Sequence, residues 1–331
     1  MIDNGKKTMS LRTKVILIGI FSLCLLVVCA CAIIGFQVYQ VNIRQYDQTS
    51  SQQFEFIEQM IDLFMQNNKN TVKMLAEHPT VQAADETINS YMAAKQDVII
   101  KNMPKDSTEQ AMIALFKRIH DNYLDTAEVY FGSKWGGYAT SWDDSIQAGY
   151  DPRKRSWYRQ AEAAGGDTIV TPAYMSTIGS SVICFSRRVV SGAGAFVGCV
   201  SIEVKLAQLT AFIDSLKVGK TGYVMLFQND GTILADPMHH DLVFTKLDNA
   251  GNQYLKNFQN AGTKAEVVTI DNIQWRLRVF SIDELGWKIA VLVQNNEILE
   301  SFYRMVISMV VVGTGMLMAF FWLIFWFSKR L

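Results

Sequence analysis

The sequence has no net charge and few of the residues that build disulfide frameworks or metal sites. It contains 31 Lys and Arg residues against 31 Asp and Glu residues, so no overall field attracts it to nucleic acid. Three of its five cysteines lie in one apolar block, which leaves only Cys184 and Cys199 elsewhere. One pair at that spacing is no disulfide framework, and the Cys and His residues match no metal-ligand spacing. We therefore expect no metal, no cofactor and no nucleic-acid partner.

Catalytic motifs are also missing from the sequence. No nucleophile elbow, phosphate-cradling glycine loop or paired-acid motif stands out. The adjacent His239 and His240 of "MHHD" are a poor metal-ligand pair, because neighbours on a loop rarely converge on one ion. These absences predict that the chain is not an enzyme.

Long hydrophobic runs are present near both ends. The runs at residues 15–36, "VILIGIFSLCLLVVCACAIIGF", and 305–327, "MVISMVVVGTGMLMAFFWLIFWF", contain no charge. Each is long enough, at about 1.5 Å per residue, to cross a hydrocarbon core of roughly 30 Å. Basic residues flank the outer ends of both runs: Lys6, Lys7, Arg12 and Lys14, then Lys329 and Arg330. The positive-inside rule therefore places residues 1–14 and 328–331 in the cytoplasm and residues 37–304 outside it.

Two alternatives to a retained first span stay open. One is a cleaved signal peptide, although its apolar region is normally shorter, about 7 to 15 residues. The other is a lipoprotein signal with Cys31 acylated, for which Ala30 is suitably small and Cys29 is a poor fit. The second run predicts a transmembrane helix in either case.

Residues 37–78 predict a long stalk helix that continues the first span. Apolar residues recur there at helical spacing, and Pro79 ends the pattern: Ile43, Phe54, Ile57, Ile61, Phe64, Val72 and Leu75. A narrow apolar stripe on so long a helix predicts packing on a second copy as well as on the chain's own domain, giving a homodimer. The alternative is a helix that covers only its own sheet.

The rest of the outer region predicts an α+β fold of two modules in series, at residues 79–218 and 219–294. Helical patterns at 109–123 and 205–219, the second ending at Gly219, alternate with short strand-like runs. The turn "SGAGAF" and the triplet Asn229-Asp230-Gly231 each predict a hairpin. Residues 295–304 predict a helix that connects the second module to the second span.

Four motifs then point to a known family. They are "YDPRKRSWYRQA", "TPAY", "GCVSIEV" and "GKTGYVMLFQNDGTILADP", in that order. In order and spacing they resemble the double Cache sensor domains of bacterial transmembrane receptors of the methyl-accepting chemotaxis protein type. The resemblance covers residues 37–294 and implies two PAS-like Cache modules on a long N-terminal helix, with a ligand held in the membrane-distal module.

The resemblance also implies a set of ligand-binding residues. In the subset of the family that binds amino acids, the matching positions here are Tyr150, Arg155, Trp157, Tyr158, Tyr174 and Glu203. Glu203 departs from the pattern, because the family has aspartate at that place. Being longer by one methylene, it narrows the space near the ligand's amine or shifts the ligand.

The chemistry of these residues is consistent with a small zwitterion. Arginine supplies a planar, bidentate fork for a carboxylate. Aromatic faces attract an ammonium, and a carboxylate completes its site with a charge-assisted hydrogen bond. The alternatives without a ligand are a structural ion pair for Arg155 and core packing for Trp157 and Tyr158. Glu203 faces the site only if strand alternation turns it inward with Cys199 and Ser201; a slip of one residue turns it to solvent.

We therefore interpret the sequence as the sensor region of a multi-pass receptor in the bacterial inner membrane, with its ligand site in the periplasmic or extracellular part. The favoured ligand is an amino acid, with amines or small organic acids as alternatives. A chemoreceptor is the favoured context, and the sensor region of a histidine kinase or diguanylate cyclase is the alternative. A structural membrane protein without a ligand is the rival interpretation.

Overall fold

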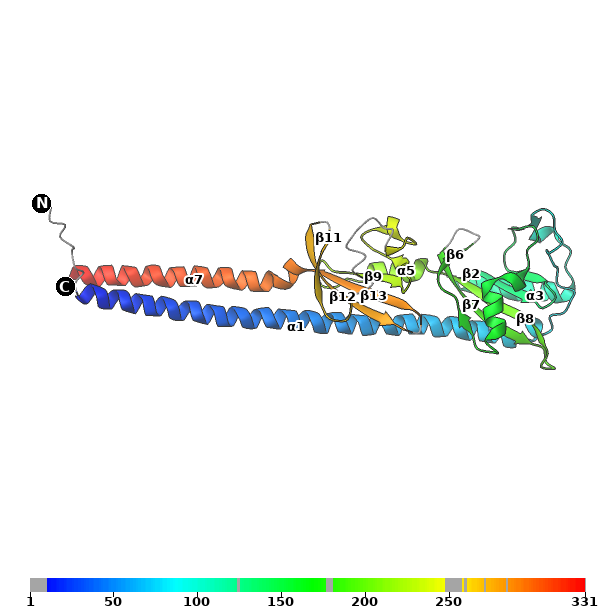
Figure 1. The fold of residues 1–331 in the computed structure, drawn as a ribbon, viewed down its shortest axis with the longest axis horizontal. Helices are drawn as coiled ribbons and strands as arrows, with labels where there is room; N and C mark the ends of the chain where they lie inside the picture. Colours follow the sequence, from blue (N-terminus) through cyan, green and yellow to red (C-terminus); the bar gives the residue numbers. More distant parts are fainter. Residues whose placement is uncertain are drawn as a thin grey trace.

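The computed structural model describes residues 11–123, 126–176, 181–247, 258, 261–270, 272–283 and 285–330, and it sets two α+β modules along one long helix (Figure 1). Helix α1 (Leu11–Glu77) joins the first apolar run to the predicted stalk without a break. At 1.5 Å per residue its length is about 100 Å. It ends before Pro79, which begins the short helix α2 (Pro79–Gln82).

One face of α1 packs on both modules. Ile57, Ile61, Val72 and Leu75 are buried in the main core. The ring of Phe54 stacks on Phe280 of the membrane-proximal module, with 4.4 Å between the ring centroids. The stripe found in the sequence therefore packs on the chain's own sheets, as expected, and its predicted contact with a second copy stays a prediction.

The membrane-distal module contains an antiparallel six-stranded sheet with the order β3-β2-β8-β7-β5, in which β6 also pairs with β7. The strands are β2 (Thr126–Ser133), β3 (Tyr138–Thr140), β5 (Ile169–Val170), β6 (Tyr174–Met175), β7 (Ser181–Val190) and β8 (Phe196–Lys205). The predicted hairpin across "SGAGAF" is present as the pair β7 and β8. A separate two-stranded sheet pairs β1 (Val98–Ile99) with β4 (Ser145–Ile146).

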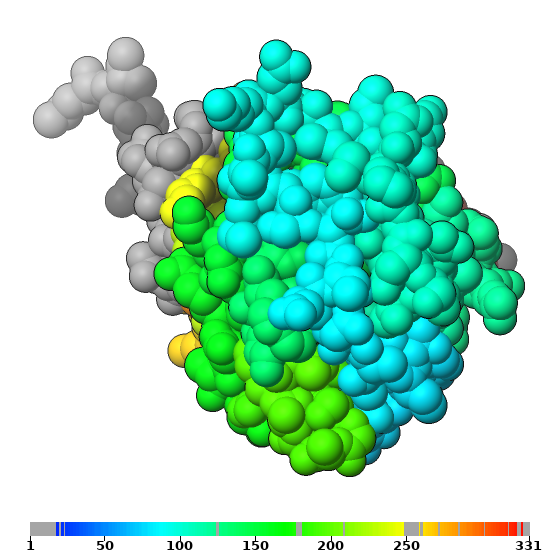
Figure 2. Space-filling model, turned by 90° about the vertical axis from the view of Figure 1, so that its right-hand side faces the viewer, coloured from blue at the N-terminus to red at the C-terminus, as the bar shows by residue number. Residues whose placement is uncertain are grey.

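The helices of this module are η1 (Ile100–Asn102), α3 (Ser107–Asn122), η2 (Pro152–Lys154) and α4 (Ser156–Ala163). Asp106 caps α3 by accepting a 2.7 Å hydrogen bond from the Glu109 amide. The segment that follows α1 covers much of the outer end of the module (cyan in Figure 2). The two faces of the large sheet therefore have different surroundings: one packs on α1, and the other is covered by loops and α4.

The membrane-proximal module has a five-stranded antiparallel sheet with the order β10-β9-β13-β12-β11. Its strands are β9 (Tyr223–Gln228), β10 (Ile233–Ala235), β11 (Glu266–Ile270), β12 (Ile273–Ile282) and β13 (Trp287–Gln294), with the 3-10 helix η3 (His240–Leu242) after β10. The hairpin predicted at Asn229-Asp230-Gly231 joins β9 to β10. The chain is thus an α+β protein with two sheets in series, as its sequence predicts.

The helix between the modules is shorter than predicted. Helix α5 (Ala207–Ser215) ends four residues before Gly219, because Leu216 is extended and Val218 forms a bridge with Gly222. Gly219 makes the tight turn of that bridge with a φ of +67°, where a Cβ atom would lie 2.4 Å from the Glu297 Oε1 atom. The turn is therefore pressed against the start of the last helix.

Helix α7 (Asn295–Arg330) contains both the predicted connecting helix and the second apolar run. It lies beside the N-terminal part of α1, and the outer ends of the two helices lie at the same end of the molecule (Figure 1). By length and composition, both helices can cross a membrane. Of the predicted cytoplasmic ends, residues 1–10 and 331 lie outside the described residues.

Candidate functional site

A cavity of about 780 Å³ lies on the face of the distal sheet that loops and α4 cover. This volume is in the range of small-molecule sites. Its walls come from β2, β3, β6 and β8 below and from the loop, η2 and α4 segment above. Charged and aromatic side chains dominate the lining: Asp97, Glu128, Tyr130, Tyr138, Trp142, Asp144, Tyr150, Lys154, Arg155, Trp157, Tyr174 and Glu203.

The basic segment is held over the sheet by its own side chains. Asp151 caps η2, and its carboxylate accepts hydrogen bonds of 2.9 Å from both Nε and Nη2 of Arg153. Gly132 on β2 lets Trp157 approach closely, since a Cβ atom there would lie 2.9 Å from the Trp157 ring. Arg155 follows η2 and leads into α4, at the exposed edge of the cavity.

The guanidinium of Arg155 faces an aromatic ring at the edge of the cavity. Its Cζ atom lies 5.7 Å from the ring centroid of Tyr150. Among the described residues, its guanidinium forms no hydrogen bond or salt bridge. The described residues therefore do not show the structural ion pair that was the alternative for Arg155. The five N–H donors of the guanidinium remain available for an anion.

Glu203 lies deep in the cavity and is hydrogen-bonded to tyrosine hydroxyls. Its Oε1 atom accepts a hydrogen bond of 2.6 Å from Tyr174 and one of 3.2 Å from Tyr130. Burial raises the pKa of Glu203, while these donors and the nearby Arg155 act in the opposite direction. Of the two strand registers considered, the one that turns Glu203 inward is the one observed.

A second buried carboxylate, Glu128, lies beside Glu203 and was missed by the sequence reasoning. The two residues are register partners on β2 and β8, so their side chains share one face of the sheet. Tyr138 donates a 2.8 Å hydrogen bond to the Glu128 Oε1 atom, and the Thr140 hydroxyl donates a second. Burial and the charge of Glu203 raise the pKa of Glu128 to about 7.

Two tyrosines of the cavity wall were also missed. The Tyr130 ring meets Trp157 edge to face at 4.9 Å between centroids, and the Tyr138 ring lies 4.8 Å from Tyr150. The run "AEVYFGS" contained a usable signal, because strand alternation places Glu128 and Tyr130 on the same face. A carboxylate in an otherwise apolar strand should have drawn attention to that face.

Five of the six predicted ligand residues line the cavity, and Tyr158 does not. Successive residues of a helix point about 100° apart, so Trp157 and Tyr158 of α4 cannot both face the same space. The Tyr158 ring instead packs against Phe196, with 6.3 Å between centroids, and its backbone carbonyl lies near Cys199. Tyr158 therefore lies in the core, which agrees with the alternative of core packing, and it is not among the residues that line the cavity.

Among the other cations of the basic segment, only Lys154 lines the cavity. Its side chain is exposed and stands at the rim. Arg153 is paired with Asp151, and Arg159 lies on the exposed side of α4. The segment therefore contributes two cations to the cavity.

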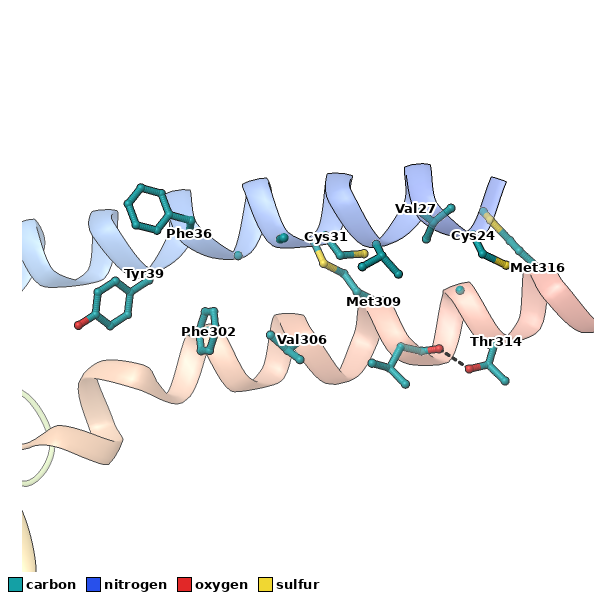
Figure 3. A pocket seen from close by; sticks show the side chains of 15 residues that line it. Cys24, Val27, Cys31, Phe36, Tyr39, Phe302, Val306, Met309, Thr314 and Met316 are labelled. Carbon is teal, nitrogen blue, oxygen red and sulfur yellow. Dashed lines mark hydrogen bonds between the residues drawn. The ribbon is translucent and has the colours of Figure 1, made fainter. Parts of the chain in front are cut away.

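A different cavity, of about 720 Å³, lies between the apolar parts of α1 and α7 (Figure 3). Its lining is apolar, with residues such as Val27, Phe36, Val306 and Met309. The hydroxyl of Thr314 donates to the Val310 carbonyl of its own helix, at 2.7 Å. Because none of the described side chains that line it is charged, this cavity does not suit a zwitterion.

Comparison with known proteins finds bacterial chemoreceptors. The chain is 28% identical to the methyl-accepting chemotaxis protein McpB of Bacillus subtilis over 212 residues, which are 64% of this chain and 30% of that protein. It is 31% identical to McpG of Pseudomonas putida over 173 residues, 51% of this chain and 26% of that protein. The chain thus spans less than a third of the length of these relatives.

Solved structures share the fold. The ligand-binding domain of the Pseudomonas aeruginosa amino acid chemoreceptor PctC, in complex with GABA, matches with a TM-score of 0.57 and 23% identity, covering 75% of this chain and 99% of that one. The domain of Pseudomonas fluorescens CtaA with L-serine matches with a TM-score of 0.58 and 18% identity, covering 76% and 99%.

A family model matches most of this chain. The model of the Cache domain, in its double form dCache_1, matches residues 38–302, which include both sheets and the stalk. Its limits agree with the region over which the sequence motifs resemble the double Cache sensors. The chain therefore belongs to the Cache domain family.

Proposed function

We propose that the chain is the sensing and membrane-anchoring region of a bacterial chemoreceptor, and that its distal cavity binds an amino acid. The names of the relatives support the chemoreceptor context, and the solved structures that share its fold include domains bound to amino acids. The proposed location is the bacterial cell membrane, with both modules on the outer side. Two helices that are apolar enough to span, with their outer ends together, support this topology.

The observation that carries the ligand proposal is the pairing of opposite charges across one aromatic cavity. Arg155 offers a free guanidinium at the rim, and Glu203 offers a buried carboxylate on the floor. An α-amino acid places its carboxylate on the arginine fork and its ammonium on Glu203 and the surrounding rings. A simple amine leaves Arg155 unpaired, and a simple organic acid leaves Glu203 buried without a cation, so each uses half of the site.

Ligand binding is tested by thermal-shift measurements on the full chain in lipid nanodiscs, against amino acids, amines and small organic acids. We expect at least one α-amino acid to raise the melting temperature, because a ligand that binds only the folded state stabilises it. The substitution Arg155→Ala removes the carboxylate fork and is expected to abolish that shift. The matched control is Arg159→Ala, which removes a cation of the same segment outside the cavity.

If no compound shifts the melting temperature, the chain is better described as a structural membrane protein. If amines alone do so and Arg155→Ala has no effect, the site is an amine sensor. A shift retained in Arg155→Ala with an amino acid contradicts the proposed carboxylate contact.

We also propose a route from the cavity to α7. Tyr174 donates a hydrogen bond to Glu203. The residue before it, Ala173, donates its backbone N–H to the Gln228 Oε1 atom of the proximal module, at 3.0 Å. Gln228 is the register partner of Trp287 on β13, the strand that runs into α7. A ligand that favours one position of the Tyr174 segment therefore acts on the strand next to the second span.

The turn between the modules is a second contact on this route. Glu297, in the first turn of α7, accepts hydrogen bonds from the backbone amides of Lys220 and Thr221, at 2.7 and 2.8 Å. The Lys220 ammonium also lies 2.9 Å from Glu300. Movement of the turn relative to the proximal sheet is thereby passed to the start of α7.

Finally, we propose a homodimer through the outer face of α1. This face carries a row of residues at alternating spacings of four and three: Phe56, Met60, Leu63, Asn67, Asn70 and Met74. The four apolar members of the row are exposed. That is the repeat of a coiled-coil seam. In a background with Cys24, Cys29 and Cys31 changed to serine, Met60→Cys is expected to form a disulfide-linked dimer on oxidation, whereas Asp62→Cys, on the flank of the helix, is not. Equal cross-linking of the two variants would contradict this interface.

A further inference from the structure

We propose that Glu128 is a specificity residue, and that the cavity selects amino acids carrying a second positive group on the side chain. This inference rests on the proposed function and extends it from amino acids in general to basic ones. Its basis is the pair of carboxylates on the floor of the cavity, only one of which is needed for an α-ammonium.

Glu128 is as deeply buried in the cavity as Glu203. Both are 8% exposed, and both line the cavity. Register partners on neighbouring antiparallel strands place their Cβ atoms about 5 Å apart. Two cationic groups of one small ligand, separated by a short chain, can therefore meet one carboxylate each.

The neighbours of Glu128 favour its ionised form when a cation is supplied. Tyr138 and Thr140, both on the edge strand β3, donate hydroxyl hydrogen bonds to its Oε1 atom. Such donors stabilise a carboxylate. Tyr130, Tyr138 and Tyr150 line the same cavity and contact one another, and their rings attract a cation.

Acidic side chains outnumber basic ones in the lining of the cavity. Four acidic side chains line it, against two basic ones: Asp97, Glu128, Asp144 and Glu203, with Lys154 and Arg155. A neutral amino acid satisfies Arg155 and Glu203 but leaves Glu128 either protonated or buried without a cation. A basic side chain pairs with Glu128 and removes that cost. Burial and the charge of Glu203 raise the pKa of Glu128, and a ligand cation beside it offsets both effects.

The experiment compares L-lysine with L-norleucine, which has the same carbon chain without the ammonium, by isothermal titration calorimetry on the full chain in nanodiscs. We expect the wild-type protein to bind lysine at least about tenfold more tightly than norleucine. Glu128→Gln keeps the shape but removes the charge, and it is expected to bring this ratio close to one while norleucine affinity changes little. Glu128→Asp retains the charge and is expected to keep a preference for lysine.

Two controls separate specificity from damage to the fold. Glu162→Gln removes an exposed acid outside the cavity and is expected to leave the ratio unchanged. Melting temperatures of all variants report whether they fold. A wild-type protein that binds norleucine as tightly as lysine, or a ratio unchanged in Glu128→Gln, overturns the inference but leaves amino-acid sensing intact. Absence of binding by any amino acid overturns the proposed function itself.

Discussion

Glu128 and Glu203 are hydrogen-bonded mainly to hydroxyl groups, which stabilise a carboxylate without neutralising it. Tyr174 and Tyr130 donate to Glu203, and Tyr138 and Thr140 donate to Glu128. This arrangement keeps the carboxylates in place and, in the function proposed above, leaves their charge to pair with a ligand. Such preorganisation lowers the ordering cost of binding.

Removing one of these donors tests the arrangement. Tyr174→Phe deletes the 2.6 Å hydrogen bond to Glu203 and is expected to weaken amino-acid binding by about tenfold or more, since hydrogen bonds to charged groups contribute about 1.5 to 3 kcal/mol. The control is Tyr158→Phe, which loses a hydroxyl outside the cavity and should bind as the wild type does. Titration calorimetry measures both, and a larger loss in Tyr158→Phe would restore that residue to the site.

The raised pKa of Glu128 also predicts a pH dependence of stability. Its pKa is about 7 in the folded protein against an ordinary value of 4.5, so the folded state holds a proton that the unfolded state releases. This contribution is full below about pH 4.5 and is lost as pH rises through about 7, and over that range it amounts to roughly 3 kcal/mol. The melting temperature of the ligand-free protein should therefore fall between pH 5 and pH 8.

Glu128→Gln should flatten that decline, because glutamine does not titrate. Part of the slope should remain, since burial also raises the pKa of Glu203. The measurement is intrinsic tryptophan fluorescence during heating at a series of pH values. An identical slope in the variant and the wild type would show that Glu128 is ionised alike in both states.

At the scale of elements, α1 presents two apolar faces with different roles. The inner face, with Ile57 and Ile61, is fully covered by the sheets, and the outer face, with Met60 and Leu63, is open. Helical periodicity places residues on faces but cannot say what covers each face. The sheet positions decide this, because β7, β8, β12 and β13 all meet the same side of the helix.

A matched pair of truncations distinguishes the two faces. Ile61→Ala leaves a cavity in the core and is expected to cost about 2 to 4 kcal/mol, because Ile61 is 0% exposed. Leu63→Ala removes a side chain that is 55% exposed and should leave monomer stability nearly unchanged. Thermal unfolding of the two variants, diluted to prevent dimer formation, gives the comparison. Equal losses would mean that the outer face is already covered within one chain.

At the scale of the whole molecule, the two modules are joined by few polar contacts and one continuous helix. The backbone N–H of Ala173 and the side chain of Gln228 form a direct hydrogen bond between the sheets. The modules also share a core along α1. On the proposed route, a small shift of the distal sheet reaches α7 through these contacts while α1 stays fixed.

Gln228→Ala is expected to uncouple binding from this movement. It removes the acceptor for Ala173 without touching the cavity, so amino-acid affinity should be retained. Spin labels at Gln37→Cys and Tyr303→Cys, in a background without Cys24, Cys29 and Cys31, report the distance between α1 and α7. Ligand should change this distance in the wild type and in the control Asn229→Ala, but not in Gln228→Ala. A ligand-induced change preserved in Gln228→Ala would place the route elsewhere.

Local pattern alone determined much of this protein: the two apolar helices, the stalk, both hairpins, and the basic and aromatic segment beside the cavity. These features depend on periodicity, turn residues and neighbours in the chain, which the sequence displays directly. Tyr150, Arg155 and Trp157 could be chosen because they lie within a few residues of one another in a recognisable motif.

Tertiary structure decided which side chains meet. Glu128, Tyr130 and Tyr138 reach the cavity because β3 pairs with β2 and β2 pairs with β8 in a particular register, and no local pattern specifies these pairings. The direction of α4 over Gly132 sends Trp157 into the cavity and Tyr158 into the core. Long-range register and helix phase arise only when the elements pack, so the floor of the site became visible only in three dimensions.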